Sequence, residues 1–346
     1  MSSPASTNVN AKTLDLKRLY LPIERDLLET TELLKRKLSH DIPLFNEYLE
    51  YSFRLGGKRL RPALVLLCGK AWGKITTQHY LCGAALEMIH TGSLVHDDIL
   101  DGAYFRRQLQ TFNAKWDSKR AVLVGDLLIT RALSLICECN DLLVFEKTAK
   151  FCTSTVEGEL MQVESVGNFE LTFEQYRQIV GGKTASLLEA STFLGGYLAG
   201  ASDRALELFA QFGQTLGVAF QIVDDTLDLV GEEETLGKTL GSDLVNQKET
   251  LPLILYFQRA PKAEADAFKA QLQQGVPFDA RAQIAKRLQD QGVIDATYEV
   301  AQQQVQKARD ILLQLKEIGA EMALSLDLQA FESLEALAEF VVKRQK

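Results

Sequence analysis

Proline is scarce in this chain of 346 residues, which contains only seven. None of them lies between Pro62 and Pro252. Because proline interrupts helices and is common at turns, so long a stretch without it favours helices over many short strands. The strict alternation of apolar and polar residues that is typical of half-buried strands is also missing. We therefore predict an all-α fold.

Basic excess, long apolar runs and paired cysteine motifs are absent as well. Lys and Arg number 38 against 46 Asp and Glu, a formal net charge of −8, which argues against a general nucleic-acid-binding protein. No apolar run reaches the length of a membrane span, so we expect none. The five cysteines form no Cys-x-x-Cys motif, and we expect them to be reduced thiols packed as small hydrophobic groups.

The N-terminus carries no recognisable targeting signal. Its first ten residues are small and polar, without an apolar signal core, and we expect residues 1–12 to form a disordered tail. No arginine precedes Arg18 and an acidic residue comes early, at Asp15, which argues against a mitochondrial transit peptide. The cytoplasm is therefore the predicted compartment.

Residues 13–346 read as one large helical domain without a convincing linker. Apolar residues recur at helical spacing through most of this length. The predicted helical segments are 14–38, 63–72, 79–101, 122–140, 142–166, 173–201 and 203–230, followed by a helical region over 258–346 that is interrupted near Pro277.

Two of these segments end in the same pattern, Asp-Asp-x-x-Asp. Residues four apart share a helix face, so Asp97 and Asp101 point the same way, as do Asp224 and Asp228. Like charges at this spacing repel one another. A glycine follows each cluster closely and places it near a helix C-terminus, where the helix dipole also disfavours negative charge. Two unfavourable features in each of two matching clusters indicate function.

A bound divalent cation would reverse both of these penalties. Mg²⁺ is the predicted metal because it takes carboxylate oxygens, keeps several waters and bridges phosphates. For either cluster alone, the alternative is a solvated acidic helix end. That alternative becomes much weaker for two clusters that each follow an apolar helix.

Basic residues accompany the two clusters, as an anionic substrate would require. Backbone N–H groups and cationic side chains in the glycine-containing segment 56–62 suit a phosphate group. Each basic pair alone could belong to the solvated surface. Chance is a much poorer explanation for basic residues that precede and follow the acidic clusters in this order. The basic residues concerned are Lys58, Arg59, Arg61, Arg106, Arg107, Lys238 and Lys248.

With these motifs the sequence resembles the trans-isoprenyl diphosphate synthases, or polyprenyl synthetases, over roughly residues 51–256. The resemblance implies a single all-α bundle around a central cavity, and a homodimer. It also implies about three Mg²⁺ ions per active site. The predicted metal ligands are Asp97, Asp101, Asp224 and Asp228, with Asp98 and Asp225 as weaker candidates.

The same resemblance implies roles for the other candidates. Isopentenyl diphosphate would bind at Lys58, Arg61, His90 and Arg107. Arg106 would contact the allylic diphosphate, and Lys238 and Lys248 would hold the departing diphosphate. Lys183, Thr184 and Gln221 match residues that line the reacting centre. For His90, as for His96, the alternative is a hydrogen-bonded core histidine.

Three loop positions depart from the family's usual pattern. Gln108-Leu-Gln stands where Gly-x-Pro is frequent, Gln247 replaces the usual glycine before Lys248, and Thr239 replaces a proline. No charged position of the motifs is lost.

The predicted activity is a Mg²⁺-dependent, head-to-tail condensation of isopentenyl diphosphate with an allylic diphosphate. Metal ions and cations stabilise the departing diphosphate, and the allylic carbocation is attacked by the double bond of isopentenyl diphosphate. Three alternatives remain: a geranylgeranyl (C20) diphosphate synthase, a cyclase or head-to-head synthase, and a non-catalytic subunit of a heteromeric synthase. The basic segment argues against the cyclase, and the presence of both aspartate motifs argues against the non-catalytic subunit.

Product length is predicted from the helix that carries Asp97. Gly92 and Ser93 lie about one turn before this aspartate and are small, whereas a bulky aromatic near these positions stops growth at farnesyl (C15) in the family. The next apolar residues, Met88 and Ile89, come about two turns before it. We therefore predict products longer than C15, in the range C30–C50.

Overall fold

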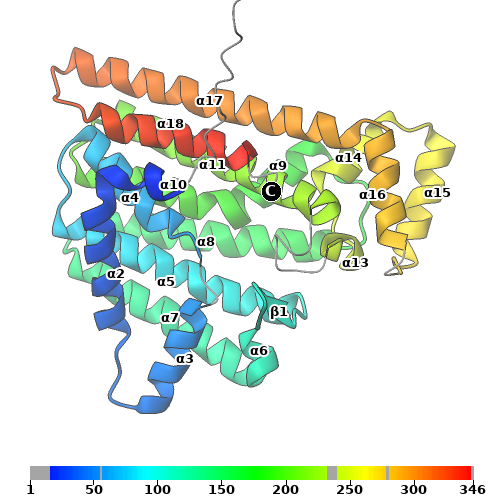
Figure 1. The fold of residues 1–346 in the computed structure, drawn as a ribbon, viewed down its shortest axis with the longest axis horizontal. Helices are drawn as coiled ribbons and strands as arrows, with labels where there is room; N and C mark the ends of the chain where they lie inside the picture. The colour runs from blue at the N-terminus through cyan, green and yellow to red at the C-terminus, as the bar shows by residue number, and fades with distance from the viewer. Residues whose placement is uncertain (1–15, 55–56, 232–239, 278–279, 344–346) are drawn as a thin grey trace, which may run out of the picture.

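The computed structural model describes residues 16–54, 57–231, 240–277 and 280–343. Helices dominate these residues, which confirms the predicted all-α class (Figure 1). The tail predicted for residues 1–12 and the candidate Lys238 lie outside the described residues. Among the described helices, none is both long and apolar enough to cross a membrane.

The elements follow one another along the chain as Figure 1 labels them. They are α1 (Leu16–Leu19), η1 (Leu21–Ile23), α2 (Glu24–Leu38), α3 (Pro43–Arg54), α4 (Leu60–Trp72), α5 (Thr77–Leu100), β1 (Phe105–Arg106), β2 (Leu109–Gln110), α6 (Phe112–Lys115), α7 (Ser118–Glu138), α8 (Leu142–Ser165), α9 (Phe173–Val180), η2 (Gly181–Ala185), α10 (Ser186–Leu198), α11 (Asp203–Val230), α13 (Ser242–Val245), α14 (Leu251–Arg259), α15 (Lys262–Gln273), α16 (Arg281–Asp290), α17 (Val293–Glu321) and α18 (Leu328–Lys343).

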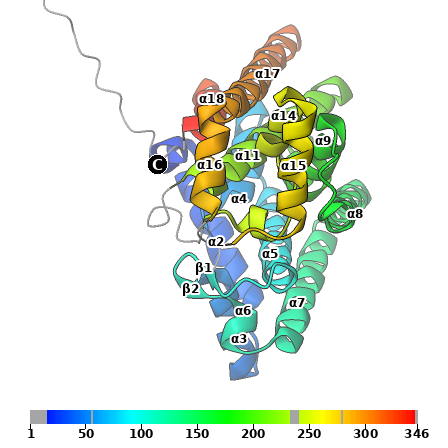
Figure 2. The same cartoon turned by 90° about the vertical axis from the view of Figure 1, so that its right-hand side faces the viewer.

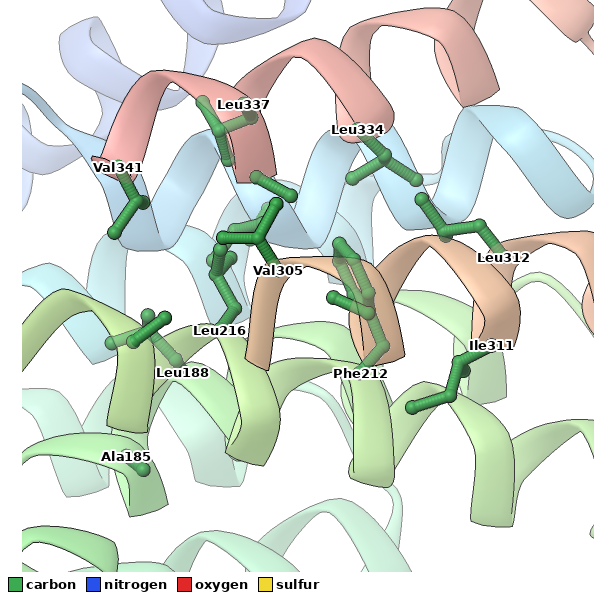
Figure 3. Close-up of a cluster of buried hydrophobic side chains, with 14 of the residues drawn as sticks. Ala185, Leu188, Phe212, Leu216, Val305, Ile311, Leu312, Leu334, Leu337 and Val341 are labelled. Carbon is green, nitrogen blue, oxygen red and sulfur yellow. The ribbon is translucent and has the colours of Figure 1, made fainter. Parts of the chain in front are cut away.

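One hydrophobic core surrounds α11, a helix of 28 residues. Figure 3 shows its side chains meeting those of α10, α17 and α18, with Leu188, Phe212 and Leu337 among those labelled. Figure 1 shows α17 and α18 running together along one side of the bundle. Burying an apolar face on several sides holds α11 rigidly and so fixes the position of the aspartate cluster at its end.

A second core joins α5 to α7, with α2, α3 and α10 around it. Figure 2 shows α2, α5 and α7 on the same side of the molecule. Close approach of α5 and α7 depends on glycine, because a Cβ at Gly92 would lie 3.0 Å from the carbonyl oxygen of Gly125. This core holds the cluster at the end of α5. Of the cysteines, Cys68, Cys82 and Cys139 are buried, but Cys137 is exposed, so the prediction of packed thiols holds only in part.

The segments 14–38 and 173–201 contain breaks that the periodicity did not predict. A 3₁₀ turn containing Pro22 separates α1 from α2, since proline cannot sit inside a helix. In the second segment a π-helical stretch, η2, lies between α9 and α10. Such stretches are frequent at functional sites.

Strands also occur, in a short hairpin that the sequence did not predict. β1 and β2 pair antiparallel, and the two residues between them, Arg107 and Gln108, have φ angles of 50° and 63°. Positive φ at both central positions is the geometry of a two-residue hairpin turn, although glycine or asparagine is usual there. This hairpin includes the loop position at which Gln108 stands where the resembled family frequently has glycine.

Gly195 provides a test of the helix packing around α10. A Cβ there would collide with the backbone oxygen of Val65 on α4 and come within 2.9 Å of the Cys68 Cβ. Because backbone cannot rotate aside, we expect Gly195→Ala to lower the free energy of unfolding by about 2–3 kcal/mol. Gly200→Ala, where φ is 83° and nothing lies within 4 Å, should cost about 1 kcal/mol from backbone strain alone. Denaturant unfolding measures both, and equal losses would contradict this packing argument.

Candidate active site

The two aspartate clusters lie at the C-terminal ends of two long helices, α5 and α11. Lys248, which follows α13, connects the two regions, because its Nζ lies 2.8 Å from an oxygen of Asp101. The charge of Asp224 in turn acts on Arg107 in the hairpin turn after α5. The structure thus brings residues around the two clusters near one another.

Asp97 lies near charged residues of η2 and α8. Burial raises the pKa of Asp97 to about 6; the charge of Lys183 opposes this shift, and those of Glu159 and Asp101 add to it. Lys183, which lies in η2, contacts two side chains of α8: its Nζ is 2.5 Å from an oxygen of Glu159 and 2.6 Å from Oε1 of Gln162. Neither Glu159 nor Gln162 was identified from the sequence. Helical spacing places both on one face of α8, but no motif marks them.

The π-helical stretch η2 explains how Lys183 and Thr184 come into this site. Gly182 packs against α8, where a Cβ at Gly158 would overlap the backbone of Lys183. This glycine-to-glycine contact lets the two backbones approach closely. The wider turn of η2 then carries Lys183 toward Glu159, and Thr184 toward Gln221, to whose Oε1 its hydroxyl donates over 2.7 Å.

The middle aspartate of each motif is engaged with protein groups. Asp98 is 1% exposed and accepts from Nε of Arg106 at 2.9 Å. Asp225 is 5% exposed and accepts from the Tyr176 hydroxyl at 2.6 Å and from the Gln221 amide at 2.7 Å. Burial, and the nearby charge of Asp243, raise the pKa of Asp225.

Asp228, predicted as a metal ligand, is fully buried at the end of α11. Its two carboxylate oxygens accept from the Ser242 hydroxyl at 2.8 Å and from the backbone N–H of Asp243 at 3.0 Å. In this arrangement Asp228 fixes the start of α13. Asp224 and Asp101 are more accessible, so the carboxylates of the two motifs are not equivalent in the structure.

The donor set fits Mg²⁺, although its ligands are not gathered around one point. Among the residues that the structure describes, no group of three or more His, Cys, Asp or Glu side chains is arranged to hold a metal ion. The ammonium groups of Lys248 and Lys183 instead lie against the acids of the site. Carboxylate oxygens that attract cations are a suitable ligand set for a divalent cation. Asp97, Asp101 and Asp224 are the residues best placed to provide it.

A group of guanidinium ions lies near His90, about two turns before Asp97 on α5. Burial and then the positive charges of Arg61, Arg106, Arg107 and Arg59 lower the pKa of His90 well below its usual value. The ring is therefore neutral and can donate a hydrogen bond without adding charge. The structure thus brings Arg61, His90 and Arg107, predicted for isopentenyl diphosphate, near Arg106, predicted for the allylic diphosphate.

Besides Asp98, the guanidinium groups have a second buried counter-charge, Glu87, which the sequence motifs did not identify. Glu87 is 2% exposed, and its Oε1 lies 2.8 Å from Nη1 of Arg59. Burial lowers the pKa of Arg61 to about 10, which the charge of Glu87 partly offsets. The Nε of Arg61 is buried and has no hydrogen-bond partner among the described residues. A buried, unpaired guanidinium donor fits an anionic ligand.

Lys58 and Gly57 lie at the entrance to α4. The Lys58 ammonium lies over the ring of Phe340, 5.1 Å from its centroid, and its carbonyl accepts from Tyr20. Gly57 packs directly on the guanidinium of Arg107, where a Cβ would overlap it. The glycine of this segment thus makes room for an arginine that belongs to the same predicted site.

The predicted product-length residues are all on α5 but have different surroundings. Ser93 is partly buried, and its hydroxyl donates to the His90 carbonyl at 2.9 Å. Gly92 faces α7, with Ile129 and Leu128 near a Cβ built there. Met88 and Ile89 are 0% and 4% exposed, within the core around α5 and α7. Ser93 is therefore the position where a larger side chain disturbs helix packing least.

Removing the charge of Asp97 is expected to stabilise the metal-free protein. Its pKa is raised in the folded state, so the folded protein holds this proton where the unfolded chain releases it. Stability should therefore fall as pH rises from about 4 to about 6, and remain lower above that range. Asp97→Asn should raise the free energy of unfolding by about 1–2 kcal/mol at pH 8, and by less at pH 5.

Urea unfolding in the presence of a chelator measures this effect. Asp266→Asn, on the exposed surface of α15, is the matched control and should change little. A stabilisation of Asp97→Asn that grew toward low pH would contradict the assigned sign.

Known proteins share both the sequence pattern and this architecture. The family model described as polyprenyl synthetase matches residues 42–289. An all-trans-nonaprenyl-diphosphate synthase (geranyl-diphosphate specific) of Rhodobacter capsulatus is 32% identical over 313 residues, which are 90% of this chain and 96% of the relative. An octaprenyl diphosphate synthase of Escherichia coli is 31% identical, over 85% of this chain and 91% of its own. The crystal structure of a polyprenyl synthase from Caulobacter crescentus, complexed with calcium and isoprenyl diphosphate, superposes with a TM-score of 0.88 at 32% identity, covering 97% of this chain and 99% of that one.

Proposed function

Because this chain belongs to the polyprenyl synthetase family, we propose that it is a trans-polyprenyl diphosphate synthase that adds isopentenyl diphosphate head to tail onto an allylic diphosphate. The observation that carries the proposal is the arrangement around α5. Its carboxylates lie beside Lys183 and Lys248, and its His90 lies among four arginines. Two diphosphate substrates need two such charged regions close together.

The residues of these two regions bind different substrates. Arg61, Arg107 and neutral His90 bind and orient isopentenyl diphosphate, with Lys58 at the edge. Arg106, held by Asp98, orients the allylic diphosphate. Lys248 neutralises charge on the diphosphate as it leaves.

Thr184 and Gln221 present oxygen dipoles to the allylic carbocation, together with the neighbouring backbone of η2. Lys183 lies in the same region and is held by α8. Lys238 keeps its proposed role beside the leaving diphosphate and lies outside the described residues.

Mg²⁺ is the proposed cofactor, with about three ions per site. When bound, it would act as a Lewis acid on the diphosphate oxygens and help the leaving group to depart. Asp97, Asp101 and Asp224 would hold it, with Asp228 joining if its bonds to the α13 segment rearrange. Calcium accompanies isoprenyl diphosphate in the Caulobacter crescentus structure, which supports a divalent cation in this one.

The proposed product is longer than C15, in the range C30–C50. The small side chain at Ser93 supports this, as do the nonaprenyl and octaprenyl products in the names of two relatives. A C20 product and a non-catalytic subunit are the alternatives. The second is disfavoured because both aspartate motifs and their partners are complete in this chain.

An elongation assay tests the proposal directly. The purified protein is incubated with Mg²⁺, farnesyl diphosphate and labelled isopentenyl diphosphate, and the products are separated by length. We expect C30–C50 products that disappear with EDTA. Release of free diphosphate with a cyclic hydrocarbon would indicate a cyclase, a single C20 product a geranylgeranyl diphosphate synthase, and no turnover a subunit that needs a partner.

A homodimer is the proposed assembly, and the surface of α7 and α8 supports it. Their large exposed apolar side chains include Leu123, Val156 and Leu160, at 67%, 60% and 59% exposure. Exposed apolar side chains gathered on neighbouring helices are typical of an interface. The cytoplasm remains the proposed compartment, which fractionation of cells would test.

Sedimentation should show a species of about twice 38.5 kDa at micromolar concentration. Leu123→Glu combined with Leu160→Glu should shift it to the monomer, because charges would be buried without partners. Leu313→Glu, at another exposed leucine on α17, is the control and should stay dimeric. A monomeric wild-type protein would reject this assembly.

A further inference from the structure

A chain of hydrogen bonds runs from α9 through α11 to η2. The Tyr176 hydroxyl donates to Oδ2 of Asp225 at 2.6 Å, and Nε2 of Gln221 donates to Oδ1 of the same carboxylate at 2.7 Å. The Thr184 hydroxyl donates to Oε1 of Gln221 at 2.7 Å. Tyr176 and Asp225 are buried, at 3% and 5% exposure, whereas Gln221 and Thr184 are partly exposed. The chain thus leads from the protein interior to the site.

The carboxylate sets the direction of every bond in this chain. In the structure the Gln221 amide turns its NH₂ group toward Asp225, whose oxygen Oδ1 accepts the hydrogen bond. The amide oxygen then faces Thr184, whose hydroxyl can only donate to it. The Thr184 hydroxyl proton therefore points toward Gln221, and the lone pairs of its oxygen point away from Gln221. Without the carboxylate, the amide could turn over and the hydroxyl could rotate.

We infer that Asp225 and Tyr176 are positioning residues, which fix the Gln221 amide and the Thr184 hydroxyl so that their negative ends face the reacting carbon. The inference rests on the proposed condensation, in which an allylic carbocation forms near Thr184. Dipoles that are already oriented stabilise a developing charge without having to reorganise. Asp225 accordingly orients this series of hydrogen bonds and is not a metal ligand, although it belongs to the second aspartate motif.

Asp225→Asn tests the direction of the chain, because it keeps the shape and replaces an acceptor by a donor. We expect kcat to fall at least ~10-fold, while KM for both diphosphates and the Mg²⁺ concentration for half-maximal rate change less than about twofold. Tyr176→Phe removes one bond to the carboxylate, and kcat should fall about 3- to 10-fold. A large rise in the Mg²⁺ requirement of Asp225→Asn would show a metal ligand and overturn the inference.

Two further variants separate positioning from general loss of structure. Tyr197→Phe removes a similar bond from a tyrosine to an aspartate, Asp141, at the far end of α10, and should keep wild-type kcat. In a Thr184→Val background, Asp225→Asn should lose most of its effect, because the hydroxyl that it orients is gone. Full additivity of the two changes, or an equal loss in Tyr197→Phe, would contradict the inference.

Crystal structures give a readout that does not depend on activity. In Asp225→Asn we expect the Gln221 side chain to move away from Thr184, and an unchanged position would overturn the inference. If the wild-type protein made no elongated product at all, the proposed function would fail. The crystal structures would still decide whether Asp225 orients Gln221.

Discussion

Asp97→Ala and Asp224→Ala are each expected to keep their fold and to lose elongation activity by at least ~10²-fold in kcat. Asp97 lies on the face of α5 that meets Lys183, and Asp224 lies where its charge reaches Arg107. Each carboxylate is proposed to hold a cation on the diphosphate. An interaction that strengthens as the leaving group departs acts mainly on kcat.

Initial rates at saturating Mg²⁺ and both substrates measure the loss, and circular dichroism with thermal unfolding checks the fold. Asp266→Ala on the exposed surface of α15 is the control and should retain full activity. Either site variant with near-normal rates under these conditions would show that the metal assignment is wrong.

Ser93→Phe is expected to shorten the product sharply while the first condensation continues. Ser93 lies one turn before Asp97, and its small side chain is bonded only to the His90 carbonyl among the contacts described. A phenyl ring there would occupy the path along α5 that a growing chain is proposed to follow. The carboxylates and cations that carry out the reaction would be unchanged.

Product analysis by reversed-phase chromatography, with farnesyl diphosphate as primer, measures the distribution. Ser93→Ala is the matched control and should give the wild-type range, because it removes only a hydroxyl. Gly92→Phe is a less clear test, since the Gly125 backbone and Ile129 lie against that position and α7 would have to move. If Ser93→Phe left the distribution unchanged, or the wild type stopped at farnesyl, the proposed path would be incorrect.

The sequence was most informative where charge and helical spacing act together. Four-residue spacing placed Asp97 with Asp101, and the glycines after each cluster indicated helix ends, as observed for α5 and α11. The scarcity of proline likewise predicted the fold class. These features are local, so one sequence is enough to read them.

Contacts between distant segments were beyond such reasoning. Tyr176 reaches Asp225 only because α9 packs beside α11, and nothing in its own neighbourhood marks it. Glu159 and Glu87 carry no motif and gain their importance from the cations opposite them. The π-helical stretch of η2 depends on Gly158 of another helix. Tertiary packing determines each of these contacts, so the periodicity of a single segment cannot predict them.

If Asp101 holds Mg²⁺ as proposed, its ion pair with Lys248 means that an ammonium group of the protein competes with the metal ion. An ammonium tethered 2.8 Å from the carboxylate has a high effective concentration, so Mg²⁺ alone should bind weakly there. A diphosphate that attracts Lys248 releases Asp101 at the same moment. Anion and cation should therefore bind with positive cooperativity, each raising the affinity for the other by the same factor.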